Sequence, residues 1–182
     1  MRGHTKPVLS SAPTRRAALG LGSGALLLAL GGVGLALQPS VHRAARQSLL
    51  SLDPASFSVL VALAETVCPA VGDLPGAWDL GVPERVDEHL ATLHPADARD
   101  VHRALLLLEN GLFGLLLDGR PRTFTASDPE ARRDVLTRWR DSRLTVRRSA
   151  YRALVSLVSS SYWSLPRTFA VMGYPGPPAV FG

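Results

Sequence analysis

The chain has 182 residues, a single cysteine and a formal net charge of +5. Four of its 20 basic residues precede position 38, a stretch without acids, so the remainder carries 16 arginines against 15 acidic residues. A basic leader therefore accounts for most of the charge, and no nucleic-acid partner is indicated. The lone Cys68 excludes an intramolecular disulfide and every zinc, iron–sulfur or haem pattern that needs several cysteines.

The N-terminal segment has the layout of an export signal. Arg15 and Arg16 directly precede an uncharged apolar run from Ala17 to Leu37. An arginine pair ahead of a moderately apolar run indicates the twin-arginine (Tat) pathway, which carries proteins that have already folded. The alternative is an ordinary membrane anchor, because a helix of this length reaches about 31 Å and can span a bilayer core. Cleavage is left open, since only Gly34 and Ala36 offer small residues at suitable spacing.

The chain then divides into three parts: the leader or anchor over residues 1–37, a linker over 38–52 and a helical domain over 53–182. Asp53 and Pro54 predict the start of the first helix, as an N-cap and a proline in the first turn, and Pro69 ends it near Cys68. Residues 70–82 have the glycine, proline and aspartate content of a loop. A second, short helix is predicted from Pro83 to about residue 94.

A longer helix is predicted over residues 95–117. Residues 104–108 and 112–117 are apolar nearly all round, which is typical of the central buried helix of a bundle. Glu109, Asn110 and Gly111 interrupt that run.

Two more helices follow. Residues 127–130 form a predicted capping box for a helix that runs to about Arg140. The last helix, over about 144–161, is expected to turn Val146, Tyr151, Leu154, Val155 and Val158 inward and Arg147, Arg148 and Arg152 outward. These elements predict an all-α bundle of about five helices. Four prolines between residues 165 and 182 predict an extended tail on the surface.

Few residues are placed to carry chemistry. His89, His94 and His102 lie near acidic residues, but their spacing puts no ligand pair on one helix face, so solvated helix surface is favoured over a metal site. Glu109 falls in the most apolar helix. A structural ion pair with Arg103 or Arg152 is favoured over a general acid, because no second catalytic group accompanies it. We predict no catalytic residue, bound cofactor or metal in this chain.

Two surfaces are candidates for contact with a partner. Between Arg132 and Arg152 eight arginines face only Asp134 and Asp141. This face is either simply solvated or docks an acidic protein surface or lipid headgroups. The C-terminal tail displays aromatic and proline residues that contribute most when buried against another surface. The predicted partner-binding residues are Trp163, Phe169, Met172, Tyr174, Pro175, Gly176 and Pro177.

Two stretches resemble the gluconate 2-dehydrogenase subunit 3 family. Residues 161–167 read SYWSLPR and residues 169–178 read FAVMGYPGPP, similar to that family's closing tyrosine, aromatic and Gly-Tyr-x-Gly-Pro pattern. Residues 52–69 (LDPASFSVLVALAETVCP) resemble its opening helix, and Gly76-Ala77 with Gly81-Val82-Pro83 resemble its next loop. The resemblance covers about residues 50–178, and a twin-arginine leader is usual in the family. Phe169 stands where the family often has tryptophan.

The resemblance implies a small helical subunit that holds no cofactor and binds a large flavoprotein of the glucose–methanol–choline (GMC) type. The partner would hold FAD and oxidise a sugar, sugar acid or alcohol, and a cytochrome c subunit with haem would take the electrons. The small subunit would escort its partner through the Tat translocase to the periplasm or the outer face of the cytoplasmic membrane, where its N-terminal segment can contact the membrane. The alternatives are a stand-alone periplasmic helical binding protein and a membrane-tethered scaffold.

Overall fold

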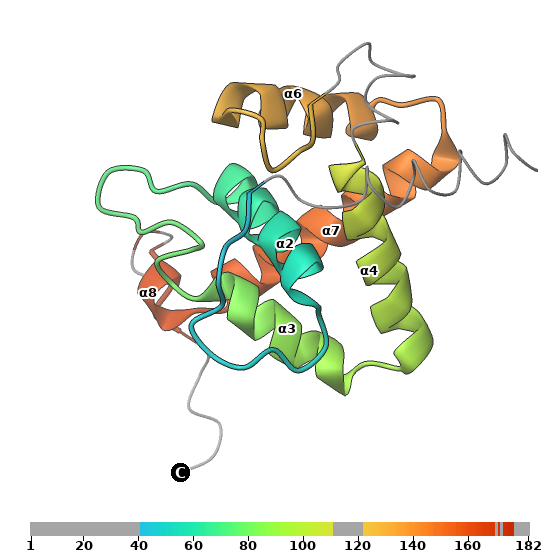
Figure 1. Cartoon of the computed structure of the whole chain (residues 1–182). Helices are drawn as coiled ribbons and strands as arrows, with labels where there is room; N and C mark the ends of the chain where they lie inside the picture. The colour runs from blue at the N-terminus through green and yellow to red at the C-terminus, as the bar shows by residue number, and fades with distance from the viewer. Residues whose placement is uncertain (1–40, 111–121, 170, 172, 177–182) are drawn as a thin grey trace, which may run out of the picture. The chain divides into compact units, whose positions relative to one another are not determined.

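We describe a computed structural model of the chain, for residues 41–110, 122–169, 171 and 173–176. By its contacts the chain divides into two units, residues 1–35 and 36–182, and all the described residues belong to the second. Their helices are α2 (Pro54–Val67), α3 (Val82–Thr92), α4 (Pro95–Glu109), α6 (Pro129–Arg140), α7 (Thr145–Trp163) and α8 (Pro166–Phe169) (Figure 1). The predicted all-α bundle is confirmed. Arg15 and Arg16 lie outside the described residues.

Helix α2 is the centre of the bundle. Asp53 caps it as predicted, because the Asp53 carboxylate accepts a hydrogen bond from the Ser56 amide at 2.8 Å. Every residue from Ser56 to Ala64 is buried, and the helix contacts α3, α4, α6 and α7 (Figure 1). The prediction that residues 95–117 form the central helix is therefore wrong. Among residues 95–110, burial of apolar side chains is confined to Leu105 and Leu108.

Helix α4 also ends earlier than predicted, at Glu109, and residues 111–121 lie outside the described part. Glu109 is fully buried, and its carboxylate accepts hydrogen bonds from the Thr125 amide at 2.8 Å and the Thr125 hydroxyl at 2.5 Å. Asn110 then adopts an extended conformation with ψ of 99°. The polar residues that interrupt the apolar run thus mark the end of the helix.

Helices α6 and α7 form a pair that covers α2. Asp128 caps α6 by accepting a bond from the Ala131 amide at 2.8 Å. This replaces the predicted capping box, because the Ser127 hydroxyl donates instead to the Thr123 carbonyl. In α7 the predicted faces are partly wrong: Arg147 is buried, whereas Val146 is 61% exposed. The Arg147 guanidinium lies 5.7 Å from the Trp139 ring centre, where a cation is favoured.

Residues 41–52, predicted as a linker, lie against α2 and α3. The Asp87 carboxylate on α3 accepts hydrogen bonds from three successive backbone amides, those of Leu50, Ser51 and Leu52, at 2.6, 3.1 and 2.7 Å. We call residues 43–52 the strap. Because one buried carboxylate satisfies three amides, the strap is held in a single path across the bundle.

Candidate functional site

The last turn of α7 holds Trp163, the first of the predicted partner-binding residues. Tyr162 is buried, and its hydroxyl donates to the Pro75 carbonyl at 2.8 Å, which ties α7 to the loop between α2 and α3. The adjacent Trp163 faces outward with 39% of its surface exposed, and the two ring centres lie 4.9 Å apart, edge to face. One neighbour therefore anchors the helix end while the other is presented to solvent.

The next residues form α8 rather than the extended chain predicted for the tail. The hydroxyl of Thr168, which is fully buried, donates to the Leu165 carbonyl at 2.8 Å and lies 3.4 Å from the Tyr162 carbonyl. The buried hydroxyl thus ties α8 to the turn that follows α7. Residues 165–169 are thus part of the folded body.

Beyond α8 the chain turns back on Phe169. The Tyr174 amide donates to the Phe169 carbonyl at 3.0 Å, and the two rings meet edge to face at 5.3 Å. Gly173 has a φ of 64°, a conformation that side chains disfavour, so glycine suits this reversal. Phe169 is half-buried, whereas Val171 is 59% and Tyr174 45% exposed.

Five of the predicted partner-binding residues fall in this described end of the chain: Trp163, Phe169, Tyr174, Pro175 and Gly176. Met172 and Pro177 lie outside the described residues. Sequence reasoning missed Val171, whose only signal was its place among tail residues already suspected. We call Trp163, Val171 and Tyr174 the exposed tail residues. They are the large apolar side chains that stay exposed in the described part of this chain end, so they are its candidate residues for contact with another surface.

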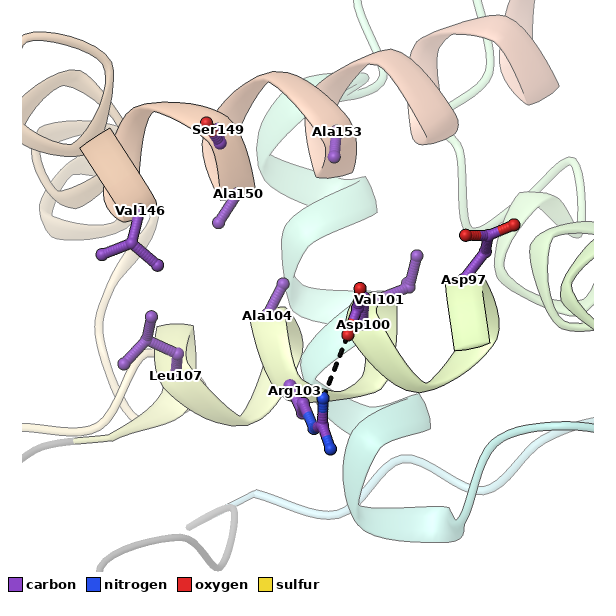
Figure 2. Close-up of a pocket in the computed structure, with 10 residues that line it drawn as sticks. All are labelled: Asp97, Asp100, Val101, Arg103, Ala104, Leu107, Val146, Ser149, Ala150 and Ala153. Carbon is purple, nitrogen blue, oxygen red and sulfur yellow. Dashed lines mark hydrogen bonds and ion pairs between the residues drawn. The ribbon is translucent and has the colours of Figure 1, made fainter. Parts of the chain in front are cut away.

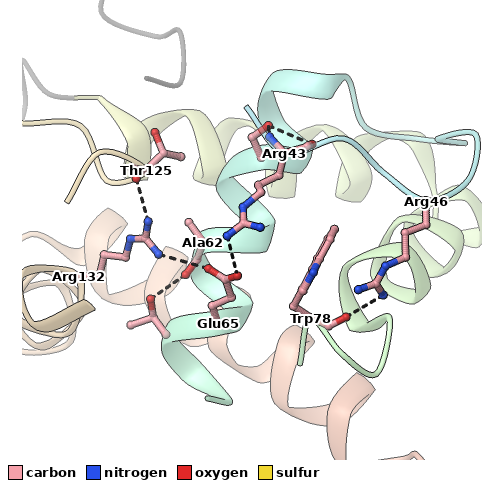
Figure 3. Close-up of polar contacts among 9 residues, drawn as sticks. Arg43, Arg46, Ala62, Glu65, Trp78, Thr125 and Arg132 are labelled. Carbon is pink, nitrogen blue, oxygen red and sulfur yellow. Dashed lines mark hydrogen bonds and ion pairs between the residues drawn. The ribbon is translucent and has the colours of Figure 1, made fainter. Parts of the chain in front are cut away.

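Three arginines of the arginine-rich face, Arg132, Arg147 and Arg148, are used inside the bundle. Arg132, whose side chain is only 14% exposed, donates to the Thr125 carbonyl at 2.8 Å and lies 3.6 Å from the Glu65 carboxylate (Figure 3). Glu65 also meets Arg43 of the strap at 3.3 Å. Arg147 is buried and Arg148 donates to the Ser142 carbonyl. The predicted face is therefore split between internal contacts and solvent.

The strap also contacts Trp78, which follows α2 in the chain. The guanidinium groups of Arg43 and Arg46 lie 5.7 and 4.1 Å from the Trp78 ring centre, and Arg46 donates to the Trp78 carbonyl at 2.8 Å (Figure 3). A cation over an indole face is favoured electrostatically. Sequence reasoning assigned no role to Arg43, Arg46 or Asp87, since none stands in a motif and each acts on a residue at least 20 positions away.

The three histidines that were weighed as metal ligands, His89, His94 and His102, do not gather in one site. His89 is exposed on α3, and His94 caps α4 through its ring nitrogen, which accepts from the Ala96 amide at 3.2 Å. In the described part of the chain, no three His, Cys, Asp or Glu side chains gather as metal ligands would. Nor is any helix there long and apolar enough to cross a membrane.

His102 on α4 lies against the start of α2. Its Nδ1 is 3.2 Å from the Ser56 hydroxyl and its Nε2 is 3.4 Å from the Asp53 carboxylate. These are the residue types of a hydrolytic triad. Ser56, however, is fully buried, and Asp53 already caps the helix through the Ser56 amide. Because no substrate can reach the hydroxyl, the contact joins α4 to α2 and is not a nucleophilic site.

Cys68 is a buried free thiol at the end of α2. Burial raises the pKa of this thiol from its ordinary 9.0 to about 11, because the apolar surroundings disfavour the thiolate. A thiol that stays protonated is a poor nucleophile and a poor metal ligand. Cys68 therefore fits the role of a core residue.

The comparison with known families decides how this geometry is to be interpreted. The family profile described as gluconate 2-dehydrogenase subunit 3 matches residues 54–180, which includes every described helix and the exposed tail residues. The chain belongs to the gluconate 2-dehydrogenase subunit 3 family. That family is one of accessory subunits of a dehydrogenase complex. No curated protein and no solved structure is significantly similar to the chain.

Proposed function

We propose that this chain is the non-catalytic small subunit of a flavin-dependent dehydrogenase, and that it carries its large subunit through the Tat pathway and stabilises it. The observation that carries the proposal is membership of the subunit 3 family together with the Arg15-Arg16 pair ahead of an apolar run. Tat transports folded cargo, so a signal on a small subunit can export a cofactor-loaded partner that has none.

The partner in this proposal is a GMC-type flavoprotein that holds FAD and oxidises a sugar, sugar acid or alcohol, with a cytochrome c subunit as electron acceptor. The complex would lie in the periplasm or on the outer face of the cytoplasmic membrane. The exposed tail residues support the proposal, because Trp163 and Tyr174 offer large amphipathic rings of the kind that dominate subunit interfaces. Arg15, Arg16 and the tail are the residues expected to carry the function.

Export is tested by replacing Arg15 and Arg16 together with lysine in cells that make both subunits. The small subunit and the flavoprotein should both accumulate in the cytoplasm. Arg2→Lys, the same change elsewhere in the leader, is the matched control and should leave export intact. Undiminished export of the Lys-Lys variant would contradict the Tat role.

The division of labour is tested by separating the subunits of the purified complex under mild denaturation. Flavin absorbance should follow the large chain, and the 19.4 kDa chain should be colourless. Flavin, haem or stoichiometric metal that stays with the small chain would contradict the non-catalytic assignment. A small chain recovered without any flavoprotein would favour the stand-alone binding protein.

A further inference from the structure

A groove of about 500 Å³ runs along the surface between α4 and α7 (Figure 2). Its apolar floor consists of Val101, Ala104 and Leu107 from α4 and Val146, Ala150 and Ala153 from α7. On each helix these positions recur every three or four residues, so they form a continuous stripe on one face. Three of the six are alanines, which leaves room for large side chains that enter from outside.

The groove is open at its Val146 end. Val146 is 61% exposed, and Leu144 at the start of the same helix is 46% exposed. Arg103, Ser149 and Ala153, which line the groove, are exposed, so the groove is a feature of the surface and not a gap in the core. A hollow with an apolar floor and exposed aliphatic residues at one end is a typical docking site.

We propose that this groove receives an amphipathic helix of the flavoprotein large subunit, an inference that rests on the proposed function. A strand would need an exposed sheet edge to satisfy its backbone, whereas the groove is walled by helix side chains. A helix satisfies its own N–H and C=O groups and needs from the groove only apolar contact. The space left by Ala104, Ala150 and Ala153 suits bulky residues spaced i, i+3 or i+4, and i+7.

Charge gives the docked helix a direction. Asp97 and Asp100 lie at the end of the groove opposite Val146, where Arg103 pairs with Asp100 at 3.1 Å (Figure 2). Among the described residues, Asp97 has no ion-pair partner. The docked helix should therefore place a lysine or arginine beside Asp97 and its largest apolar residue against Val146.

A second copy of this chain is the alternative occupant. Its contact could be two-fold or head-to-tail, and either arrangement would place another small subunit against Val146. The cross-linking test below therefore distinguishes a second copy from the flavoprotein helix.

The first test introduces a guanidinium on the groove floor. Ala153→Arg, at an exposed position of α7, should lower the flavin retained per small subunit about tenfold or more, because the charge would be buried in an apolar interface. Ala91→Arg, the same change at an exposed position of α3, is the control and should retain the flavoprotein. Both variants should keep the helical circular-dichroism signal. Full retention by Ala153→Arg would overturn the proposal.

The second test identifies the occupant directly. Val146→benzoyl-phenylalanine is introduced in the full chain, made together with the large subunit, and cross-linked peptides are identified by mass spectrometry. A flavoprotein peptide with apolar residues at helical spacing and a basic end supports the proposal. A cross-link to another small subunit, or to residues 111–121 of the same chain, overturns it. If the unchanged chain captures no flavoprotein, the proposed function fails as well, whereas a flavoprotein held elsewhere overturns only the groove assignment.

Discussion

Helix α2 and the exposed tail residues put apolar side chains to opposite uses. In α2 nine successive residues, Ser56 to Ala64, are buried, so even its two serines face protein. At the other end of the chain Trp163, Val171 and Tyr174 leave 39–59% of their surface exposed. Burial of the apolar side chains of α2 stabilises this chain. Exposure of the tail residues is compatible with solubility only if the exposed apolar surface is small or is covered by a partner.

This contrast predicts that mutations in the two regions separate stability from partner binding. Changes around α2 should lower the free energy of unfolding and affect the partner only through it. Changes in the exposed tail residues should do the reverse.

Phe57→Ala should have the largest effect among the changes around α2. The Phe57 ring is fully buried on α2, so its removal loses the transfer free energy and leaves a cavity among α2's neighbours. We expect a loss of about 3–5 kcal/mol in the free energy of unfolding, measured by urea titration followed by circular dichroism. Val171→Ala, at an exposed position, is the control and should change it by less than about 0.5 kcal/mol. Similar losses in the two variants would remove the contrast.

Asp87→Ala should come next, because it leaves three backbone amides of the strap without their acceptor. The expected loss is about 2–4 kcal/mol, with faster hydrogen exchange at Leu50, Ser51 and Leu52. Glu88→Ala is the matched control. Glu88 holds Gln47 through one exposed hydrogen bond at 2.7 Å, and its loss should matter little. Unchanged exchange in the Asp87 variant would show that the strap is held in another way.

Alkaline pH should produce a smaller loss through Cys68. Burial raises the pKa of this thiol from 9.0 to about 11, so between these values the unfolded chain has lost a proton that the folded chain keeps. Stability is therefore fully present below pH 9.0 and falls as the pH rises toward about 11, by up to about 2 kcal/mol. Urea titrations from pH 8 to 11 measure this slope.

Cys68→Ala is the control for the alkaline slope. Burial also raises the pKa of the Tyr162 phenol, which adds a loss of the same sign at high pH. The variant should therefore flatten the slope without abolishing it. An unchanged slope in Cys68→Ala would mean that the thiol does not titrate with folding.

Local signals predicted the elements well. Asp53 with Pro54, Asp128 with Pro129 and Pro95 each mark a helix start that the structure confirms. These signals act within one turn of the chain, because a cap bonds to an amide two or three residues away. Such signals give the order of α2, α4 and α6, whereas α7 begins without a side-chain cap and α8 was predicted as extended chain.

Orientation was harder to predict, since it depends on contacts between distant residues. Apolar residues on nearly all sides of 104–108 suggested a central helix, yet α2 holds that place and α4 lies at its side. Arg147 was expected outside because arginine is charged, but the Trp139 ring offers it a favourable face within the bundle. The Asp87 clamp joins residues 35 to 37 positions apart and has no local signature.

The exposed tail residues and the α4/α7 groove could also be predicted only in part, because they depend on contacts between distant residues. Composition identified Trp163 and Tyr174, because large rings in a proline-rich tail suggest docking. It could not show that Thr168 is buried, since threonine carries no preference strong enough to indicate burial. Nor could it show the α4/α7 groove, which exists only once the two helices are paired.

The smallest effect on stability is expected for Trp163→Ala. Trp163 lies beside Tyr162, so the two positions share one helix end but differ in exposure, 39% against 1%. Removing the exposed indole should change the free energy of unfolding by less than about 1 kcal/mol. It should lower the flavin retained per small subunit about tenfold or more, since aromatic residues of this kind dominate interfaces.

Tyr162→Ala is the matched comparison and should reverse the two outcomes. It removes a buried ring and the hydrogen bond to the Pro75 carbonyl, so a stability loss of about 3–5 kcal/mol is expected. Truncation at residue 165 would confuse the two effects, because it also deletes the buried Thr168. Point substitution keeps them apart: a Trp163→Ala variant that unfolds like Tyr162→Ala, or that retains all its flavoprotein, would show that the exposed tail does not bind the partner.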